Sequence, residues 1–238
     1  MRPDEYTRMR AAEDTHWWYA ALRVVVREGM GRYPFEGPLL DAGCGTGGGL
    51  TVLDDGALAY GIDRAPEALD ACKARGLPRL TRGDVTALPY RDDTFGAVMS
   101  MDVLYHRRVE PGRALAEYRR VLRSGGVVYL NLPAYEWLRS AHDTVIETER
   151  RFTREQVRGL LADAGFEVAW LSHWNMLLLP AIAAARLLGG AGGSDLERST
   201  PAWVHAVLGG VMAVERGLMK LAPLPCGVSI FAVARKMF

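Results

Sequence analysis

The sequence predicts an α/β fold in which a mostly parallel sheet carries helices on both faces. Apolar runs of strand length alternate with helical patterns along most of the 238 residues, which is typical of repeated strand–helix–strand units. A glycine-rich segment, residues 43–49, directly follows the first apolar run. Hydrophobic residues make up 49% of the chain and charged residues 24%, as in ordinary globular domains, so the chain can bury a sizeable core.

The N-terminal half of the chain supplies four of the expected strands. They span residues 38–41, 57–62, 80–83 and 95–101. We expect helices before and between them, at residues 4–30, 48–53 and 66–75. Pro66 suits the first turn of the last of these helices, because its fixed φ matches a helix start and its missing N–H has no partner there.

The C-terminal half continues the alternation. We expect helices at residues 112–122 and 153–164, and strands at residues 127–132, 166–172 and 228–234. Thr153 is predicted to cap its helix, with Gln156 completing a capping box, and Gly165 to end it. Because strand connections are right-handed, the carboxyl ends of the parallel strands, and therefore the ligand, are expected at one edge of the sheet.

The chain divides into three expected parts. They are an N-terminal helical cap at 1–35, a core at 36–173 and 227–238, and an apolar helical insert at 174–226. Three roles stay open for the insert, which contains a glycine-rich link at 189–193: packing on the sheet, a lid over an apolar pocket, or a dimer surface. Residues 168–185 carry no formal charge over nearly the length of a membrane span. We interpret them as a strand followed by a helix, because polar residues and Pro180 interrupt the run.

Three glycines after the first strand, Gly43, Gly45 and Gly48, fit the dinucleotide-binding pattern G-x-G-x-x-G. Glycine is needed in such a turn because a backbone without Cβ lets a ligand lie directly on the chain. Asp63 stands twenty residues on, as a ribose-binding acid does, so a nicotinamide-dependent dehydrogenase is one interpretation. A tight turn without a ligand is the structural alternative.

Acidic residues at the ends of three successive strands favour a different ligand. These residues are Asp41, Asp63 and Asp84. A carboxylate at position 41 would repel a pyrophosphate, whereas it suits a ligand with a positive group such as an amino-acid ammonium. Asp84 can accept a hydrogen bond from the amino group of adenine. The three carboxylates therefore indicate a cationic nucleoside rather than an anionic dinucleotide.

Four ordered motifs resemble those of the class I S-adenosylmethionine-dependent methyltransferases. They are LLDAGCGTGG (39–48), GIDRAPEAL (61–69), GDVTALPYRDDTFGAVMSMDVLYH (83–106) and RVLRSGGVVYLNLP (120–133). The resemblance is strong over residues 36–135 and weaker over 150–172 and 227–235. It implies a Rossmann-like, seven-stranded fold whose last strand is antiparallel, S-adenosylmethionine as the cofactor, and methyl transfer as the reaction.

The resemblance also implies which residues bind the cofactor. Asp41, Gly43 and Gly45 would hold its methionine part. Asp63 would bind both ribose hydroxyls, with Arg64 beside it. The remaining expected contacts are Asp84, Val85 and Met101 around adenine, and Tyr19 on an N-terminal helix that covers the cofactor.

An oxygen or nitrogen acceptor must lose a proton, so a base that titrates near neutrality is useful. His106, just past the fourth strand, is the first candidate catalytic residue, and His142, next to Asp143, is the second. Tyr135 is a candidate for a hydrogen bond to the acceptor, and Arg151 for an ion pair with its carboxylate or phosphate. Each has a structural alternative: His106 could cap the strand end, and Arg151 could belong to a solvated arginine face.

Asp102 and His106 could belong to a metal site, because their spacing of four residues suits two ligands on one helical face. In the quinone-biosynthesis O-methyltransferases, which are similar here, a glutamate precedes this histidine. Tyr105 stands in that position in this chain. This departure weakens the case for a quinone substrate, and we predict no metal.

Composition limits the partners and the compartment. Lys and Arg (29) balance Asp and Glu (28), which excludes a basic nucleic-acid-binding surface over the whole chain. Cys44, Cys72 and Cys226 form no CxxC pair, so we expect neither a disulfide framework nor structural zinc. The N-terminus lacks an apolar signal segment. We expect a cytoplasmic protein without a transmembrane span, while a homodimer and weak membrane association stay open.

The predicted function is S-adenosylmethionine-dependent methyl transfer to O or N of a small, partly apolar metabolite in biosynthesis. Two alternatives stay open. One is an enzyme that uses the cofactor without methylating, for example by cyclising its aminobutyrate chain. The other is a non-catalytic binding subunit on the same fold, because fold does not fix function. The complete set of cofactor residues argues against a subunit that has lost cofactor binding.

Overall fold

The structure is a computed structural model that describes residues 3–53, 58–140, 143–144, 146–187 and 202–237. Seven strands form one sheet in the order β3-β2-β1-β4-β5-β7-β6. The strands are β1 (Leu39–Ala42), β2 (Ala59–Asp63), β3 (Leu80–Arg82), β4 (Phe95–Met101), β5 (Leu122–Pro133), β6 (Phe166–Trp174) and β7 (Ser229–Lys236). Strands β1 to β5 pair in parallel, whereas β7 is antiparallel to both β5 and β6. The predicted fold class, with its antiparallel last strand, is confirmed.

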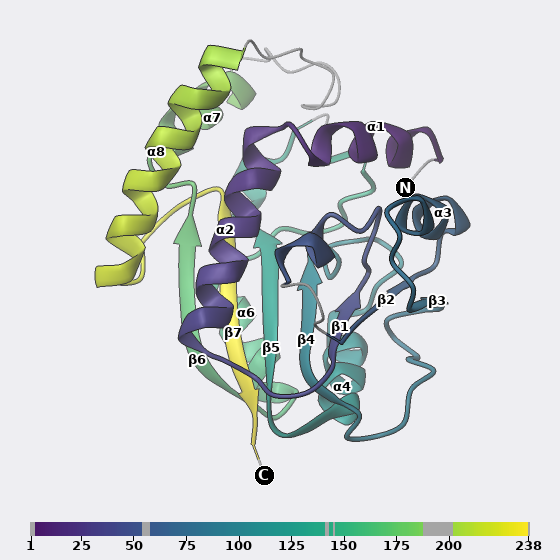
Figure 1. Cartoon of the computed structure of the whole chain (residues 1–238). Coiled ribbons are helices and arrows are strands. Elements are labelled where there is room, and N and C mark those ends of the chain that lie inside the picture. Colours follow the sequence, from purple (N-terminus) through teal and green to yellow (C-terminus); the bar gives the residue numbers. More distant parts are fainter. Residues whose placement is uncertain (1–2, 54–57, 141–142, 145, 188–201, 238) are drawn as a thin grey trace.

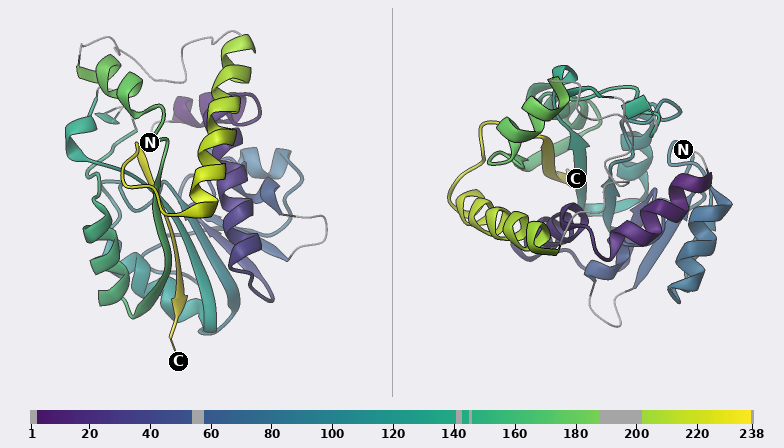
Figure 2. Two further views of the ribbon diagram at one scale, coloured as in Figure 1. Left: turned by 90° about the vertical axis from the view of Figure 1, so that its left-hand side faces the viewer. Right: turned by 90° about the horizontal axis from the view of Figure 1, so that it is seen from above.

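Helices cover both faces of this sheet. They are α1 (Pro3–Glu13), α2 (Trp17–Arg32), α3 (Pro66–Ala74), α4 (Pro111–Val121), α6 (Arg154–Asp163), α7 (Leu179–Leu187) and α8 (Ala202–Leu221), with 3-10 turns η1 (Gly49–Val52) and η2 (Glu136–Leu138). Helices α2, α3 and α8 lie on one face, and α4 and α6 on the other (Figures 1 and 2). Helices α1 and α7 lie at the carboxyl edge of the parallel strands (Figure 1).

The sheet separates two apolar clusters that hold the layers together. Tyr118 of α4 and Leu161 of α6 are fully buried in one of them. Val26 of α2 and Met212 of α8 are buried with Tyr129 of β5 in the other. Burying a side chain of this size contributes about 1.5–3 kcal/mol relative to leaving it exposed. The helices are therefore fixed to the sheet from both sides, and the carboxyl edge is left for a ligand.

The expectation of one helix over residues 4–30 is wrong, because the helix ends at Glu13 and a second helix begins at Trp17. His16 is the N-cap of α2: its backbone is extended, and its Nδ1 accepts the N–H of Trp18 at 3.3 Å. The break lets α1 cross the carboxyl edge of the sheet (Figure 1). There the carboxylate of Glu13 accepts hydrogen bonds from Thr46 Oγ1 (2.5 Å) and Arg75 Nη2 (2.7 Å).

Other elements differ from the prediction mainly at their ends. The helix expected at 48–53 is the short 3-10 turn η1. Strand β5 begins at Leu122 rather than at residue 127, and its register against β4 shifts between Phe95 and Ala97. The predicted capping box of α6 is confirmed: Thr153 Oγ1 accepts the N–H of Gln156, whose side chain accepts the N–H of Thr153.

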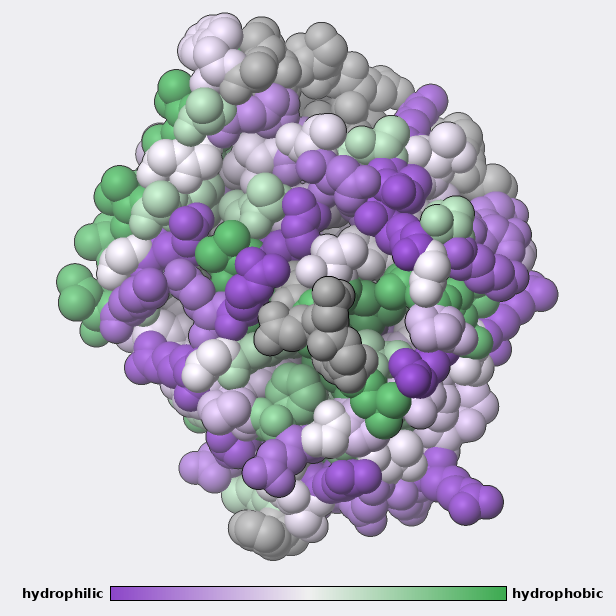
Figure 3. Space-filling model, viewed as in Figure 1, coloured by the Kyte–Doolittle hydropathy of each residue, from purple (hydrophilic) through white to green (hydrophobic). Residues whose placement is uncertain are grey.

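The uncharged stretch 168–185 is a strand followed by a helix, as predicted, and runs through β6 into α7. Within the described ranges, no helix combines the length and apolarity needed to cross a membrane. Helix α8 packs against α2 and turns one apolar stripe outward, which Figure 3 shows along its left-hand edge. The most exposed members of the stripe are Trp203, Val207, Val214 and Leu221. The glycine-rich link at 189–193 lies outside the described residues.

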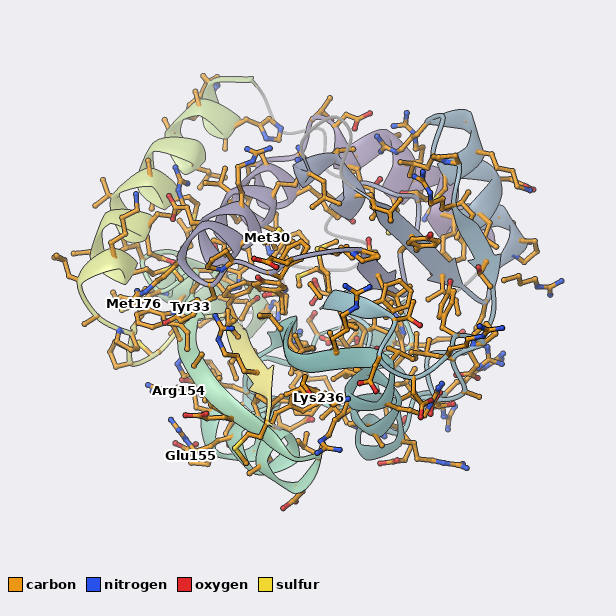
Figure 4. All side chains as sticks on the ribbon, turned by 60° about the horizontal axis from the view of Figure 1, so that its bottom comes forward. Met30, Tyr33, Arg154, Glu155, Met176 and Lys236 are labelled. Carbon is orange, nitrogen blue, oxygen red and sulfur yellow. The ribbon has the colours of Figure 1, made fainter. Side chains whose placement is uncertain are left out.

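The amino edge of the sheet is closed by the end of β7. Lys236 Nζ donates to Asp93 Oδ1 at 2.7 Å and to the carbonyl of Leu122 at 2.6 Å. Figure 4, which looks from this side, labels Lys236 near the end of the strand. These bonds tie β7 to the start of β5. Lys236 and Asp93 thus stabilise the amino edge of the sheet.

Candidate functional site

A cavity of about 810 Å³ opens at the carboxyl edge of the sheet. Helices α1 and α7 flank this edge when it is viewed from above (Figure 2, right). Most of the predicted site residues lie in its wall. These are Tyr19, Asp41, Gly43, Gly45, Asp63, Arg64, Val85, Met101, His106 and Arg151. Asp84 and Tyr135 are not in the wall, and His142 lies outside the described residues.

The turn after β1 requires glycine at positions where a side chain would strain the backbone or clash with a neighbour. Gly43 and Gly45 have φ of +86° and +52°, in the left-handed region that L side chains rarely adopt. A Cβ on Gly43 would lie 2.4 Å from Cγ2 of Val103. The turn therefore exposes bare backbone to the cavity, and a ligand can lie directly on it.

Asp63, the last residue of β2, is held in place by the backbone. Its Oδ2 accepts the N–H of Gly45 at 3.0 Å, and its Oδ1 accepts the N–H of Ala65 at 2.9 Å. Burial raises the pKa of this carboxyl, while these hydrogen bonds oppose the shift. Each carboxylate oxygen can accept a second hydrogen bond, so Asp63 fits the two vicinal hydroxyls of a ribose.

The cavity has an acidic end near the glycine turn. Burial raises the pKa of Asp41 well above its usual range, and the nearby carboxyls of Asp63 and Glu13 raise it further. Glu13 is only 5% exposed and was missed by the sequence analysis, because it reaches this place through the break between α1 and α2. A cationic ligand relieves repulsion among these carboxylates. These clustered carboxyl groups therefore suit the ammonium and sulfonium groups of S-adenosylmethionine.

Asp84 is not part of the cavity wall and shapes the turn after β3. Its Oδ1 accepts the N–H of Thr86 at 2.9 Å and the Oγ1–H of the same residue at 2.8 Å. Its other oxygen pairs with Arg64 at 3.3 Å. The neighbouring Val85 is 5% exposed and lies in the cavity wall. Asp84 thus fixes the turn that presents Val85 to the cavity.

Asp102, directly after β4, is a second residue whose role the sequence did not predict. Its φ is +59°, a strained conformation for a residue with a side chain. Asn131 Nδ2 donates to its Oδ2 at 2.9 Å, and Trp174 Nε1 donates to Asn131 Oδ1 at 2.7 Å. Burial raises the pKa of Asp102 to about 7, against the opposing effects of Asn131 and Arg151. A carboxyl that titrates near neutrality therefore lines the cavity.

His106 lies in the same wall, and its imidazole is less basic than that of an ordinary histidine. Burial lowers the pKa of its imidazole to about 4, so the ring is neutral at physiological pH. The backbone N–H of His106 donates to the carbonyl of Val103 at 3.1 Å, which fixes the loop after β4. A neutral imidazole can still accept a proton, but the low pKa makes it a weaker base than Asp102.

The two predicted substrate residues have structural partners. Arg151 is 7% exposed, and its Nε and Nη2 donate to the two carboxylate oxygens of Asp143 at 2.9 and 3.0 Å. Its Nη1 donates to the carbonyl of Ala134 at 3.1 Å. The ring of Tyr135 stacks on His173 with 5.2 Å between centroids. Arg151 thus brings a neutralised charge to the cavity wall, and Tyr135 packs against one of the two apolar clusters.

A metal cluster is not evident in the part of the chain that the structure describes: no group of three or more His, Cys, Asp or Glu side chains is arranged to hold an ion. All three cysteines are free, and Cys44 and Cys72 lie with their sulfurs 3.9 Å apart beneath the glycine turn. Carboxylates, an imidazole and backbone groups line the cavity at this edge.

Sequence comparison identifies the core of the chain. Residues 40–130 match the family model described as a methyltransferase domain. The chain is 36% identical over 146 residues to an inferred methyltransferase of Encephalitozoon cuniculi, a match that covers 60% of each protein. The matched segment thus spans less than two thirds of the length of that relative.

Structural comparison extends the likeness over nearly the whole chain. A methyltransferase solved in complex with its Trm112 activator from Haloferax volcanii has a TM-score of 0.64 and 23% identity, covering 98% of this chain and 95% of that one. The cyclase SpnF has a TM-score of 0.60 and 25% identity, covering 92% and 83%. A geranyl diphosphate methyltransferase with S-adenosylmethionine bound has a TM-score of 0.59 and 17% identity, covering 90% and 85%.

The domain match includes the glycine turn, Asp63 and Asp102, which are the residues that form the acidic end and the neighbouring wall of the cavity. The solved structures share the seven-stranded sheet with its antiparallel strand. S-Adenosylmethionine is the cofactor that the domain uses and that these residues fit. Residues 40–130 are thus a methyltransferase domain, and the chain has the fold of the class I S-adenosylmethionine-dependent methyltransferases.

Proposed function

We propose that the chain transfers a methyl group from S-adenosylmethionine to an oxygen or nitrogen of a small, partly apolar metabolite. The observation that carries the proposal is the composition of the cavity wall. One end holds Asp41, Asp63 and the glycine turn, and the wall also contains Asp102 and the apolar side chain of Ile182 on α7. When bound, the cofactor supplies an electrophilic methyl group. The protein has to supply alignment, exclusion of water and a proton acceptor.

Each cofactor residue has a proposed part. Asp63 accepts the ribose hydroxyls, and the bare backbone of Gly43 and Gly45 lies against the methionine part. Asp41 attracts the ammonium group. Asp84 is tied to Thr86 and Arg64, so we infer that it acts at adenine through the turn it fixes rather than by pointing at the base. Val85 and Met101 then contact the ring, and Tyr19 covers the cofactor from α2.

The acceptor loses its proton to a side chain in the wall. The sequence favoured His106, whereas the pKa of about 7 favours Asp102 for this role at neutral pH. The hydrogen bond from Asn131 fixes one oxygen of Asp102 and leaves the other oxygen for the acceptor. We therefore propose Asp102 as the base and His106 as a neighbour that shapes the same wall.

The proposed acceptor is a metabolite rather than a nucleic acid. The formal net charge of the chain is +1, which gives little electrostatic attraction for phosphate backbones. Residues 1–35 would act as the cap over the cofactor and residues 174–226 as the cover of the acceptor end, since α1, α2 and α7 all contribute to the cavity wall.

Product analysis tests this function directly. The protein is incubated with S-adenosylmethionine carrying a trideuterated methyl group and with a bacterial metabolite extract, and products are found by mass spectrometry. The expected result is S-adenosylhomocysteine together with a metabolite that gains one trideuteromethyl group. Neither should form with the Asp63→Ala variant. Failure to release S-adenosylhomocysteine from any extract while the protein binds the cofactor would contradict methyl transfer.

A second candidate is a reaction that uses this fold without moving the methyl group. The likeness to the cyclase SpnF, at 25% identity, favours it. A cyclisation would leave the trideuteromethyl group on the cofactor and give a metabolite of unchanged mass. Cyclisation of the cofactor's own aminobutyrate chain would release methylthioadenosine instead of S-adenosylhomocysteine. The same mass spectra therefore separate the alternatives.

A further inference from the structure

Asn175, the residue after β6, is held in an unusual conformation at the edge of the cavity. Its φ is +58°, in the left-handed region, where asparagine is among the few residues tolerated. Its backbone N–H donates to Glu215 Oε1, and the N–H of Leu177 donates to Glu215 Oε2 at 2.9 Å. Glu215 of α8 is fully buried. A buried carboxylate of the insert thus fixes the backbone around Asn175.

The side chain of Asn175 is fully buried, yet its amide is unpaired. Neither Oδ1 nor Nδ2 has a hydrogen-bond partner among the residues that the structure describes. Met176, labelled in Figure 4, packs against the apolar cluster that includes Met212 and so keeps this turn in place. Buried polar groups in folded proteins are nearly always paired, because leaving one unpaired is costly. A fixed backbone with an unpaired amide in a cavity wall indicates a ligand contact.

Strand pairing sets which groups surround this amide. Trp174, the preceding residue, pairs with Ser229 of β7, which in turn pairs with Pro133 of β5. Ser229 and Pro133 line the same cavity. Neighbouring strands are about 4.8 Å apart, so Asn175 stands three strand positions, or about 14 Å, from the end of β4, where Asp102 lies. Asn175 therefore faces a part of the acceptor remote from the methylated atom.

Two arginines and a threonine line this part of the wall beside Asn175. Arg186 of α7 donates from Nη1 to the carbonyl of Leu138 at 2.7 Å. The Arg151 guanidinium is paired with both oxygens of Asp143. Thr148, which is 7% exposed, also lines the cavity and has an Oγ1 without a partner among the described residues. An amide and a hydroxyl can each both donate and accept a hydrogen bond. A carboxylate could accept from Asn175 Nδ2 but would leave Oδ1 without a donor, whereas a group that both donates and accepts satisfies both atoms.

We propose that Asn175 recognises an uncharged donor–acceptor group, a carboxamide or a hydroxyl, on the acceptor at a distance from the methylated atom. This proposal rests on the proposed function for the identity of the ligand as a methyl acceptor. It adds the chemical class of that acceptor: an apolar metabolite with a neutral polar end. It also replaces the expectation that Arg151 selects an anionic acceptor.

Matched small molecules test the proposal without the natural substrate. Hydroxybenzene and hydroxynaphthalene scaffolds are prepared with four para or remote substituents: carboxamide, hydroxymethyl, carboxylate and methyl. Binding to the full chain saturated with S-adenosylhomocysteine is measured by ligand-observed NMR. We expect the carboxamide and hydroxymethyl compounds to bind about tenfold more tightly than their carboxylate and methyl counterparts, as one or two neutral hydrogen bonds provide.

The Asn175→Gly variant removes the amide without straining the backbone, because glycine accepts a φ of +58°. It should bind all four substituents within about twofold of one another. Tyr90→Phe removes a buried hydroxyl outside the cavity wall and should keep the preference. Equal binding of the four substituents to the wild type, no binding of any of them, or a preference that survives in Asn175→Gly would overturn the proposal.

The cofactor-induced shift in Tm of the same samples separates this proposal from the proposed function. An intact shift without a substituent preference contradicts the role of Asn175 alone. A clear substituent preference in a protein that releases no S-adenosylhomocysteine with any metabolite contradicts methyl transfer alone.

Discussion

Asp102 is the residue for which the sequence and the structure indicate the most different roles. Its position four residues before His106 suggested at most a metal ligand. In the fold it has a left-handed backbone, a half-buried side chain and a hydrogen bond from Asn131. Backbone strain of this kind costs about 1–3 kcal/mol and is concentrated at functional sites. Burial, which sets the pKa of about 7, depends on strands distant in sequence and is invisible in the local motif.

The raised pKa predicts how stability depends on pH. The pKa of Asp102 is about 7 in the fold and 3.8 for an ordinary aspartate, so the folded state binds the proton more strongly. The free energy of unfolding that this group contributes is therefore present at low pH and falls as pH rises toward 7. Relative to wild type, Asp102→Asn should gain about 2–3 kcal/mol between about pH 5 and pH 8 in urea unfolding.

The exposed Asp70→Asn variant is the control, and its unfolding free energy should follow the wild type in parallel at all pH values. If the unfolding free energy of Asp102→Asn also ran parallel to that of the wild type, the pKa of Asp102 would not be raised in the folded state.

The same residue predicts the pH dependence of turnover. If Asp102 is the base, kcat should rise through about pH 7 as the carboxyl loses its proton. Asp102→Asn should lower kcat by about 10²–10⁴ and abolish this rise, while His106→Gln should keep it. A base at His106 would instead give a rise near pH 4, retained in Asp102→Asn. Initial rates of S-adenosylhomocysteine formation across this pH range provide the measurement.

Among the elements, the turn from β1 to η1 was the most predictable and the α1–α2 segment the least. The glycine turn requires positive φ and bare backbone, which the spacing of its glycines reveals. The break after Glu13 depends on two contacts. His16 acts as the N-cap of α2, and Glu13 pairs with Arg75, the residue that follows α3. A helical pattern that continues on both sides hides such a break, because local propensity does not report a partner 62 residues away.

Two glycine variants separate backbone strain from side-chain clash at the cofactor turn. Gly43 and Gly76 both have positive φ, of +86° and +79°, but a Cβ on Gly76 meets nothing within 4 Å. Gly43→Ala should lower the free energy of unfolding by about 2–5 kcal/mol and abolish cofactor binding, because its Cβ collides with Val103.

Gly76→Ala should lower the free energy of unfolding by only about 1–2 kcal/mol and leave cofactor affinity unchanged. Equal effects of the two variants on cofactor affinity, measured by calorimetry, would contradict the close approach of a ligand to the turn.

At the scale of the whole molecule, the order of motifs determined the topology, and tertiary contacts determined the site. Strand ends that carry Asp41, Asp63 and Asp84 could be aligned from the sequence, because parallel strands end at one edge. That Asp84 would pair with Thr86, and that Arg151 would pair with Asp143, depends on side-chain contacts within loops. No periodicity encodes such pairing.

The cavity joins segments from nearly the whole chain. Glu13 comes from α1, Asp102 from the end of β4 and Asn175 from the end of β6. The acidic end and the end toward α7 are thus built by different elements around one space of about 810 Å³. We therefore propose that the cofactor is bound at the glycine turn and Asp63 and that the acceptor is bound toward α7.

The most direct test of that claim is the shift in Tm that S-adenosylmethionine causes in the wild type and in Asp63→Ala, with Asp70→Ala as a control at an exposed site. With cofactor about 100-fold above its Kd, we predict a rise of about 5–10 °C for the wild type and for Asp70→Ala, and no rise for Asp63→Ala. An equal rise in all three proteins would contradict the account.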